Sequence, residues 1–436
     1  MKQIWAKELR NEMNICLCFK KNLFVEENMT LKVSSCVPFR ISINNMFFGY
    51  GPRRMAHTHA AINEYQLDNY KGQEISIFIE CVCYRVPNFY IVNQVPFFAG
   101  EIVKGDEVIF DSFDFEAYRN YSRIQKVQRF GYQRGFTEVY DIDKTIKLEK
   151  VEVDELKSCS LDKCYAPLPI FTTKKATPYE YGQVFEVENP IEFDDSYLNR
   201  HDSWGFKKEE QEFRTTAFND KYGFSKLNKK TDILERSYID YKLDRNTAGF
   251  IAFDVDVLED TLIMINYDEI LSPYEYELTE KFRSEPNTEV ETQISKSKCL
   301  KNGASNIDVN RLHSISCITF KLSEGHYSLQ TFEPDCMQYI RFYNTYGKAK
   351  ISNVRFITYE NEYIKVKFNS VDRELNLIFN SAINTLRGNS IDVLTDCASR
   401  ERAGWLCDSY FSGIAEKIIT GKNDVERNMI QTFIDY

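Results

Sequence analysis

The chain has 436 residues, enough for roughly two to four domains, and its hydrophobic content of 43% suffices for a sizeable core. The formal net charge of −10 argues against nucleic-acid binding, which requires a basic surface. No stretch reaches the length of a membrane-spanning helix and no signal peptide precedes the first apolar run, so we expect a cytoplasmic protein with no membrane partner.

The twelve cysteines do not follow the spacing of a metal site. Cys16 and Cys18, and likewise Cys81 and Cys83, form C-x-C pairs in alternating apolar stretches, so each pair points to one face of a strand. We interpret them as small core residues. No CxxC pair or Cys/His cluster is present, so we predict no zinc site and assign no metal or cofactor. Free buried thiols are typical of a reducing compartment.

Residues 1–145 are predicted to form an N-terminal, jelly-roll-like β-sandwich. The pair Asn44 and Asn45 separates two short apolar stretches, which indicates a hairpin. Residues 75–84 alternate strictly, but the second set of positions is also largely apolar, so we expect this strand to be covered on both faces.

Four prolines interrupt residues 146–235, which we interpret as an extended connector packed on the sandwiches. Residues 236–362 alternate again and predict a second β-sandwich. Within it, Asp254 and Asp256 lie on one face of a strand, where solvated edge charges are a better interpretation than a cation site. The prolines of the connector are Pro167, Pro169, Pro178 and Pro190.

From about residue 363 the apolar period changes from 2 to 3.6, which predicts helices up to residue 436. The first helix is expected to be capped by Ser370 and to end at Gly388. A second is expected to stop at Gly421, and a third to be capped by Asp424. The apolar residues of the first helix face are Leu375, Ile378, Phe379, Ala382, Ile383 and Leu386.

The stretch 395–408 combines three carboxylates with a tryptophan. If residues 400–409 are helical, Glu401, Trp405 and Asp408 lie on one face. An indole beside a carboxylic acid excludes water and raises its pKa, as a general acid requires. The guanidinium of Arg400, next to Glu401 in sequence, would lower the pKa of Glu401 instead. Adjacent residues of a helix, however, point to different sides. Gly404 equally favours a loop that runs into a helix. From spacing alone, a solvated Arg-Glu-Arg face and a core tryptophan remain the simpler interpretation.

This stretch resembles the start of the catalytic barrel of the bacterial α-L-rhamnosidases, which are inverting glycoside hydrolases. The resemblance implies that Glu401 is the general acid and that Asp396, Trp405 and Asp408 line the rhamnose pocket. We place Arg400 with these substrate-binding residues. The family's usual proline is Ala398 here, and its usual glycine before the final aspartate is Cys407. The matching residues are Asp396, Cys397, Arg400, Glu401, Arg402, Gly404, Trp405 and Asp408.

Two further stretches resemble the same family. Gly49, Gly51, Pro52 and Arg54 match a loop of its N-terminal sandwich. Such a loop suits sugar binding, but arginines that pin the loop to the protein are the better interpretation. The stretch 133–141 matches a segment that closes the first sandwich with a strand in the family; there we expect Glu138 to make a structural hydrogen bond.

The resemblance implies a mainly β, multidomain chain: two β-sandwiches followed by the first helices of an (α/α)6 barrel. The stretch 363–436 has room for roughly three or four helices, too few for six hairpins. The family's general base lies far downstream of the acid motif. We therefore expect the N-terminal part of an α-L-rhamnosidase-like hydrolase that is inactive alone and binds a rhamnose-containing glycan or glycoside. A second chain that completes the barrel is one option that the sequence leaves open. The alternatives are a non-catalytic carbohydrate-binding β-sandwich protein and a degraded coding sequence.

Overall fold

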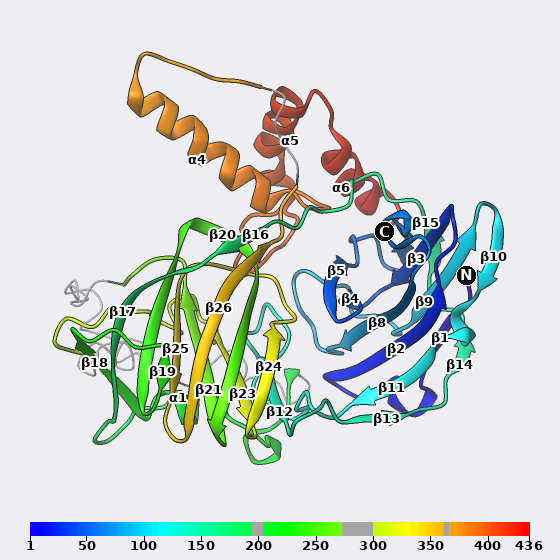
Figure 1. The fold of residues 1–436 in the computed structure, drawn as a ribbon. Helices are drawn as coiled ribbons and strands as arrows, with labels where there is room; N and C mark the ends of the chain where they lie inside the picture. Colours follow the sequence, from blue (N-terminus) through cyan, green and yellow to red (C-terminus); the bar gives the residue numbers. More distant parts are fainter. Residues whose placement is uncertain (194–203, 273–299, 362–365) are drawn as a thin grey trace. The chain divides into compact units, whose positions relative to one another are not determined.

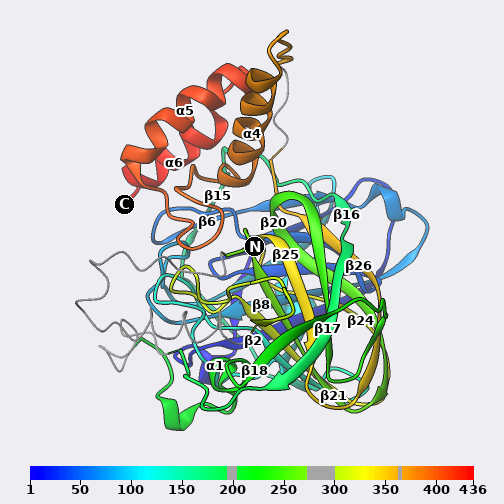
Figure 2. The same ribbon diagram turned by 90° about the vertical axis from the view of Figure 1, so that its left-hand side faces the viewer.

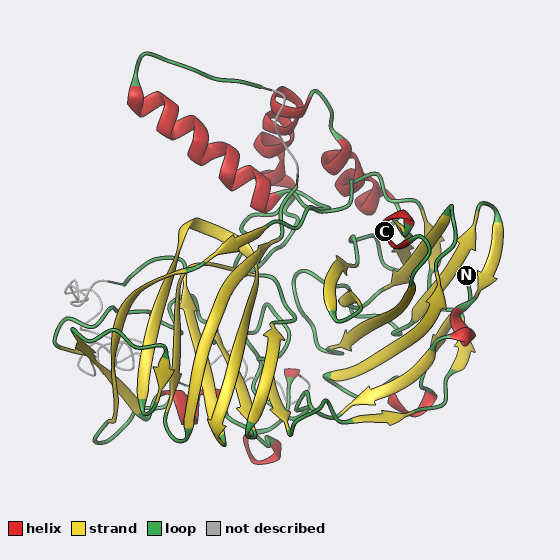
Figure 3. Cartoon of the chain, in the orientation of Figure 1, coloured by secondary structure: helices red, strands yellow, loops and turns green. Residues whose placement is uncertain are grey.

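The structure is a computed structural model that describes residues 1–193, 204–272, 300–361 and 366–436. Strands predominate, as Figure 3 shows, and the long helices of the described residues lie between positions 373 and 434. The predicted fold class, β-sandwich domains followed by a few helices, is confirmed. Among the described residues, no helix is both long and apolar enough to cross a membrane.

The chain divides into two compact units, each assembled from segments that are distant in sequence. Unit 1 comprises Met1–Tyr121, Leu148–Phe171 and Tyr359–Tyr436. Unit 2 comprises Ser122–Lys147 and Thr172–Thr358. The predicted boundary at 362/363 falls in 362–365, outside the described residues.

Two six-stranded sheets form the sandwich of unit 1 (Figure 1). Their orders are β14-β1-β9-β3-β7, with β10 on β9, and β13-β11-β2-β8-β4-β5. A separate parallel pair joins β6 to β15. The strands are β1 Gln3–Trp5, β2 Ile15–Phe24, β3 Met29–Ser35, β4 Phe39–Ile43, β5 Met46–Gly51, β6 His59–Ala61, β7 Asn63–Gln66, β8 Glu74–Cys83, β9 Phe98–Lys104, β10 Glu107–Phe110, β11 Glu116–Asn120, β13 Leu148–Lys150, β14 Asp154–Leu156 and β15 Ser160–Asp162.

The core of unit 1 follows from the alternation in its strands. Strands β2 and β8 pair antiparallel along their whole length, from Ile15 opposite Cys83 to Phe24 opposite Glu74. Their inward residues are buried with those of the facing sheet, where the rings of Phe19 and Phe98 stack with centroids 4.0 Å apart. Burial of this apolar surface is the main stabilising contribution.

The predicted hairpin is present as β4 and β5, which pair antiparallel. Both turn residues have positive φ, 51° for Asn44 and 63° for Asn45. A two-residue turn of this kind matches the twist of the strands, and asparagine tolerates the left-handed conformation better than most residues.

Unit 2 contains one twelve-stranded sheet, in which the long strand β20 pairs with different neighbours along its length. The first half of β20 pairs with β17 and β25, and the second half pairs with β24 and β26. At Gly249, a Cβ atom would lie only 2.1 Å from the carbonyl oxygen of Ile357, so glycine is required there. The elements are β12 Val139–Ile142, β16 Thr173–Lys175, β17 Thr177–Glu186, α1 Thr215–Asn219, β18 Tyr222–Leu227, β19 Ile233–Leu234, β20 Ser237–Glu259, β21 Thr261–Asp268, β22 Leu300–Lys301, β23 Cys317–Leu322, β24 Gly325–Gln330, β25 Asp335–Asn344 and β26 Lys348–Thr358.

The stretch 146–235 is more regular than a connector. Its described residues supply β13, β14 and β15 to unit 1, and β16 to β19 to unit 2. Residues 122–145, predicted within the first sandwich, lie in unit 2, where β12 pairs parallel with β23. Glu138 makes the predicted structural hydrogen bonds, accepting from the backbone N–H groups of Phe332 and Glu333.

Three helices complete unit 1 after the sandwich: α4 Arg373–Asn389, α5 Leu406–Thr420 and α6 Asp424–Ile434. The cap of α4 is Asp372, not Ser370, because the Asp372 carboxylate accepts the N–H groups of Glu374 and Leu375. The predicted end at Gly421 is confirmed by its left-handed φ of 75°. Asn423, rather than Asp424, is the N-cap residue of α6.

The helices pack on the sandwich at one end only. Figure 2 shows them beside β6 and β15, where Ala61, Cys164 and Ala166 join Leu386 and Met429 in a buried cluster. The outward apolar residues of the helices stay exposed, including Leu375 and Ile378 of the predicted apolar face of α4. The exposed large apolar residues of the three helices are Leu375, Leu377, Ile378, Leu406, Tyr410, Phe411, Ile414, Ile418, Ile430, Phe433 and Ile434.

Candidate functional site

The acidic motif forms a turn followed by a helix. Residues 398–401 are in turn conformation, residues 402–405 are irregular, and α5 begins only at Leu406 with Trp405 as its N-cap residue. A continuous helix over 400–409 is therefore wrong, and the alternative of a loop that runs into a helix is confirmed. Arg402 within this loop has a positive φ of 53°, which a helix does not permit.

Glu401 and Trp405 are in direct contact. The indole Nε1–H of Trp405 donates to the Glu401 Oε2 atom over 2.9 Å. The Glu401 side chain is only 15% exposed, whereas Trp405 is 46% exposed. The loop thus brings together a largely buried carboxylate and a half-exposed indole, the pair that the sequence predicts.

Arg400 also reaches Glu401. Its guanidinium Nη1 lies 2.7 Å from the Glu401 Oε1 atom, so each carboxylate oxygen has a partner. The expectation that adjacent residues point to different sides is wrong because residues 398–401 form a turn instead of a helix.

Asp396 closes the loop. Its Oδ1 atom accepts the Ala403 N–H over 3.0 Å, and its own N–H donates to the Ala403 carbonyl over 3.1 Å. These two bonds fix the ends of the turn that carries Arg400 and Glu401. Asp396 therefore stabilises this loop, and its role in sugar binding stays a prediction.

Asp408 lies exposed in the first turn of α5. A carboxylate there is stabilised by the positive end of the helix dipole. The structure thus brings Arg400, Glu401 and Trp405 into direct contact and fixes them through Asp396, with Asp408 on the helix that follows.

The loop is anchored to the sandwich by a buried ion pair that sequence reasoning missed. The guanidinium of Arg54 binds both oxygens of Asp392, with Nη2 2.6 Å from Oδ1, and donates to the carbonyl of Arg402. Asn428 of α6 joins the carbonyls of Arg54 and Asp392. Arg53 likewise binds Asn63 and two carbonyl groups, so the interpretation of these arginines as pins of the loop fits their contacts.

Phe89, a neighbour of Trp405, is a second residue that the sequence did not indicate. Its ring meets that of Trp405 edge to face, with centroids 6.0 Å apart and an interplanar angle of 88°. No motif or periodicity marks this residue, which lies in a loop between β8 and β9. A contact of this type adds roughly 0.5–1.5 kcal/mol beyond area burial.

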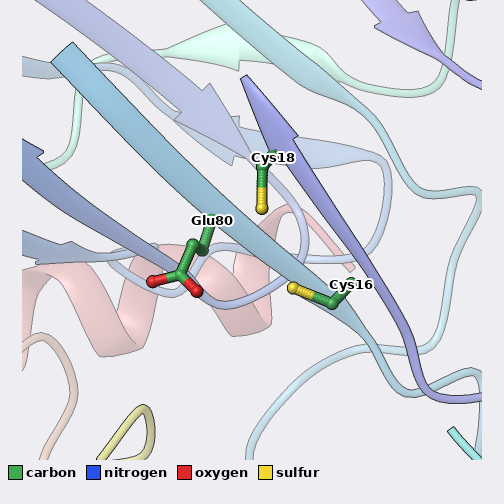
Figure 4. A group of neighbouring side chains, drawn as sticks. All are labelled: Cys16, Cys18 and Glu80. Atoms are coloured by element: carbon green, nitrogen blue, oxygen red, sulfur yellow. The ribbon is translucent and has the colours of Figure 1, made fainter. Parts of the chain in front are cut away.

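Strands β2 and β8 bring Cys16, Cys18 and Glu80 together (Figure 4), with their ligand atoms within 4.8 Å of one another. Glu80 already binds Arg40, whose Nε–H donates to Oε2 over 2.8 Å. Burial raises the pKa of Cys18 and so disfavours the thiolate that a metal requires. We therefore assign no metal to these three residues.

Comparison with known proteins agrees with the resemblance seen in the motif. Residues 365–436 match the family model of the bacterial alpha-L-rhamnosidase six-hairpin glycosidase domain. A search of the curated proteins gives no significant match.

Solved structures with a similar fold include three rhamnosidases. The GH78 family rhamnosidase of Bacillus sp. GL1 is 12% identical with a TM-score of 0.77, over 98% of this chain and 62% of that enzyme. The α-L-rhamnosidase of Aspergillus terreus is 14% identical with a TM-score of 0.57, over 98% and 44% of the two chains. The Streptomyces avermitilis α-L-rhamnosidase, solved with L-rhamnose, is 11% identical with a TM-score of 0.55, over 97% and 36%.

These findings define the class: a β-sandwich protein whose C-terminal segment matches the bacterial α-L-rhamnosidase catalytic domain. The resemblance to the bacterial α-L-rhamnosidases predicted from the sequence is thereby confirmed. The chain spans less than two thirds of the length of these solved enzymes.

Proposed function

We propose that this polypeptide supplies the proton-donor side of an inverting glycoside hydrolase that removes terminal α-L-rhamnosyl residues. Glu401 protonates the glycosidic oxygen as the bond to the sugar breaks. The observation that carries the proposal is the hydrogen bond from the Trp405 indole to Glu401, in a loop within the segment that the family model matches.

The sugar is held by the groups around Glu401. The half-exposed indole of Trp405 packs on the ring of the sugar, and Asp408 accepts hydrogen bonds from its hydroxyls. Asp396 uses the carboxylate oxygen that Ala403 does not occupy.

Arg400 has a role in both states of the site. Without sugar, its guanidinium pairs with the Glu401 carboxylate. When the sugar enters, the guanidinium donates hydrogen bonds to its hydroxyls, and Glu401 faces the glycosidic oxygen that it protonates.

Inverting hydrolysis also needs a general base about 6.5–9.5 Å from the acid, which activates a water on the opposite face of the sugar. We assign this base to no residue of the present sequence, because the family resemblance places it well beyond the acid motif. We therefore propose that the 436-residue polypeptide, taken by itself, binds rhamnosides without hydrolysing them.

Titration calorimetry with L-rhamnose tests the proposal on the purified polypeptide, verified by intact mass. We expect L-rhamnose to bind, and the double variant Glu401→Gln/Asp408→Asn to lose about tenfold or more in affinity, since each removed charge–hydroxyl bond contributes roughly 1.5–3 kcal/mol. D-Glucose serves as the control sugar.

Two outcomes would contradict the proposal. L-Rhamnose affinity that survives the double variant indicates a carbohydrate-binding β-sandwich protein without a catalytic role. Turnover of an aryl α-L-rhamnoside that Glu401→Gln abolishes contradicts the claim that the polypeptide is inactive alone.

A further inference from the structure

Unit 1 contains a cleft of about 230 Å³ whose wall joins the sandwich to the helical segment. One side is formed by the loop between β8 and β9, and the other by α6 and by Gly404, the residue before Trp405. Aromatic and aliphatic side chains predominate in this wall. They include Phe89, Tyr90, Ile91, Val92, Met429 and Phe433.

The charged groups that line the cleft already have partners within the protein. The guanidiniums of Arg53 and Arg54 bind Asn63 and Asp392, and the Nδ1 atom of His59 lies 2.8 Å from Asp162. A charged ligand would have to displace these bonds. The wall is therefore better suited to a flat apolar group than to a phosphate, a carboxylate or a chain of sugars.

The cleft begins beside the proton donor. Phe89 and Gly404 both line it, Phe89 touches the Trp405 ring, and the Trp405 indole holds Glu401. A general acid protonates the oxygen that joins the sugar to its leaving group, so the leaving group must start within reach of that acid. This places the cleft where the leaving group of a rhamnoside bound at Glu401 would lie.

We propose that the cleft receives an aromatic aglycone of an α-L-rhamnoside, with Phe89 as a specificity-determining residue that packs against the aglycone ring. This inference rests on the proposed function. The cleft is smaller than the roughly 300–1,000 Å³ of sites for drug-sized ligands, so it takes one or two fused rings. Loop 85–95 of the sandwich thus selects the leaving group, and the motif at 396–408 selects the sugar.

The test compares the affinities of methyl α-L-rhamnoside and 2-naphthyl α-L-rhamnoside by titration calorimetry on the whole polypeptide. We expect the naphthyl glycoside to bind about tenfold tighter, which is the effect of burying and stacking one aromatic group. Phe89→Ala is expected to bring this ratio close to one. Phe89→Leu preserves apolar volume without the ring and is expected to give an intermediate ratio if the alanine variant does not fold.

Phe113→Ala is the matched control. Phe113 is 45% exposed, close to the 42% of Phe89, but lies on a short 3-10 helix (Ser112–Asp114) away from the cleft wall. It should leave the naphthyl-to-methyl ratio unchanged.

The two proposals fail in different ways. If neither glycoside nor L-rhamnose binds the wild-type polypeptide, the proposed function fails. If both glycosides bind with equal affinity, or if the ratio survives Phe89→Ala and Phe89→Leu, the sugar site stands and the aglycone cleft is overturned.

Discussion

At the scale of single residues, Glu401 and Trp405 were accessible from the sequence because they belong to a compact motif of carboxylates and an indole. The pairing of Arg400 with Glu401 was not, because it depends on a turn whose conformation a spacing argument does not specify. Phe89 and Asp392 could not be assigned to the site from the sequence either, because each contacts a residue more than 300 positions away along the chain.

The Arg54–Asp392 ion pair gives a stability prediction at this scale. The Asp392 side chain is only 2% exposed, so Asp392→Asn leaves the Arg54 guanidinium buried without its charge partner. We expect the free energy of unfolding to fall by about 3–5 kcal/mol, measured by urea denaturation.

Glu27→Gln is the control for this prediction. Its ion pair with Lys71 is exposed on both sides, so its loss should cost less than about 1 kcal/mol. A similar small loss in both variants would show that Arg54 and Asp392 do not anchor the loop.

At the scale of elements, local signals were sufficient for the hairpin β4–β5, whose Asn-Asn turn adopts the required positive φ, and for the positions of α4, α5 and α6. Strand pairings between distant parts of the chain could not be predicted from the sequence. Pro178 suggested a break, yet it lies in β17 beside a register shift, a place in a strand where proline is tolerated. Likewise β12 pairs with β23, nearly 180 residues later, and no local pattern encodes that partner.

The contact between α5 and α6 predicts a pH dependence. The buried carboxylate of Glu416 on α5 accepts the N–H groups of Val425 and Glu426 in the first turn of α6. Burial raises its pKa above the ordinary value of 4.5. The folded state therefore binds the proton more tightly than the unfolded state, and this group's contribution to stability falls as the pH rises from 4.5 through the folded pKa.

The measurement is the free energy of unfolding as a function of pH for the wild type and for Glu416→Gln. The difference between the two curves should change across that window and become constant above the folded pKa. Glu8→Gln, at an exposed position, is the control. A wild-type-minus-Glu416→Gln difference that is flat over the window would contradict the prediction.

At the scale of the whole molecule, the helices leave an unusual amount of apolar surface open to solvent. Phe411 is 73% exposed and Ile418 is 66% exposed, whereas Met429 is buried. Helical periodicity predicts such an apolar face without specifying what covers it. Large exposed apolar patches are typical of interaction surfaces.

We therefore predict that the 436-residue polypeptide associates with itself through these helices. Sedimentation velocity should show a larger species whose fraction rises with concentration, and Phe411→Lys/Ile418→Lys should reduce it several-fold. Phe24→Lys, at a 54%-exposed position on the sandwich, is the matched control and should have no effect. A monodisperse monomer at all concentrations would contradict this prediction.

The central claim is that Glu401 and Trp405 form the sugar-facing wall of a rhamnoside site. The most direct measurement is the ¹H–¹⁵N spectrum of the three tryptophan indoles during titration with L-rhamnose, with the Trp405 signal assigned through Trp405→Phe. Our account predicts that the Trp405 indole resonance moves saturably, while that of Trp5, fully buried in the sandwich core, stays in place. A Trp405 resonance that remains fixed at high L-rhamnose concentration would contradict it.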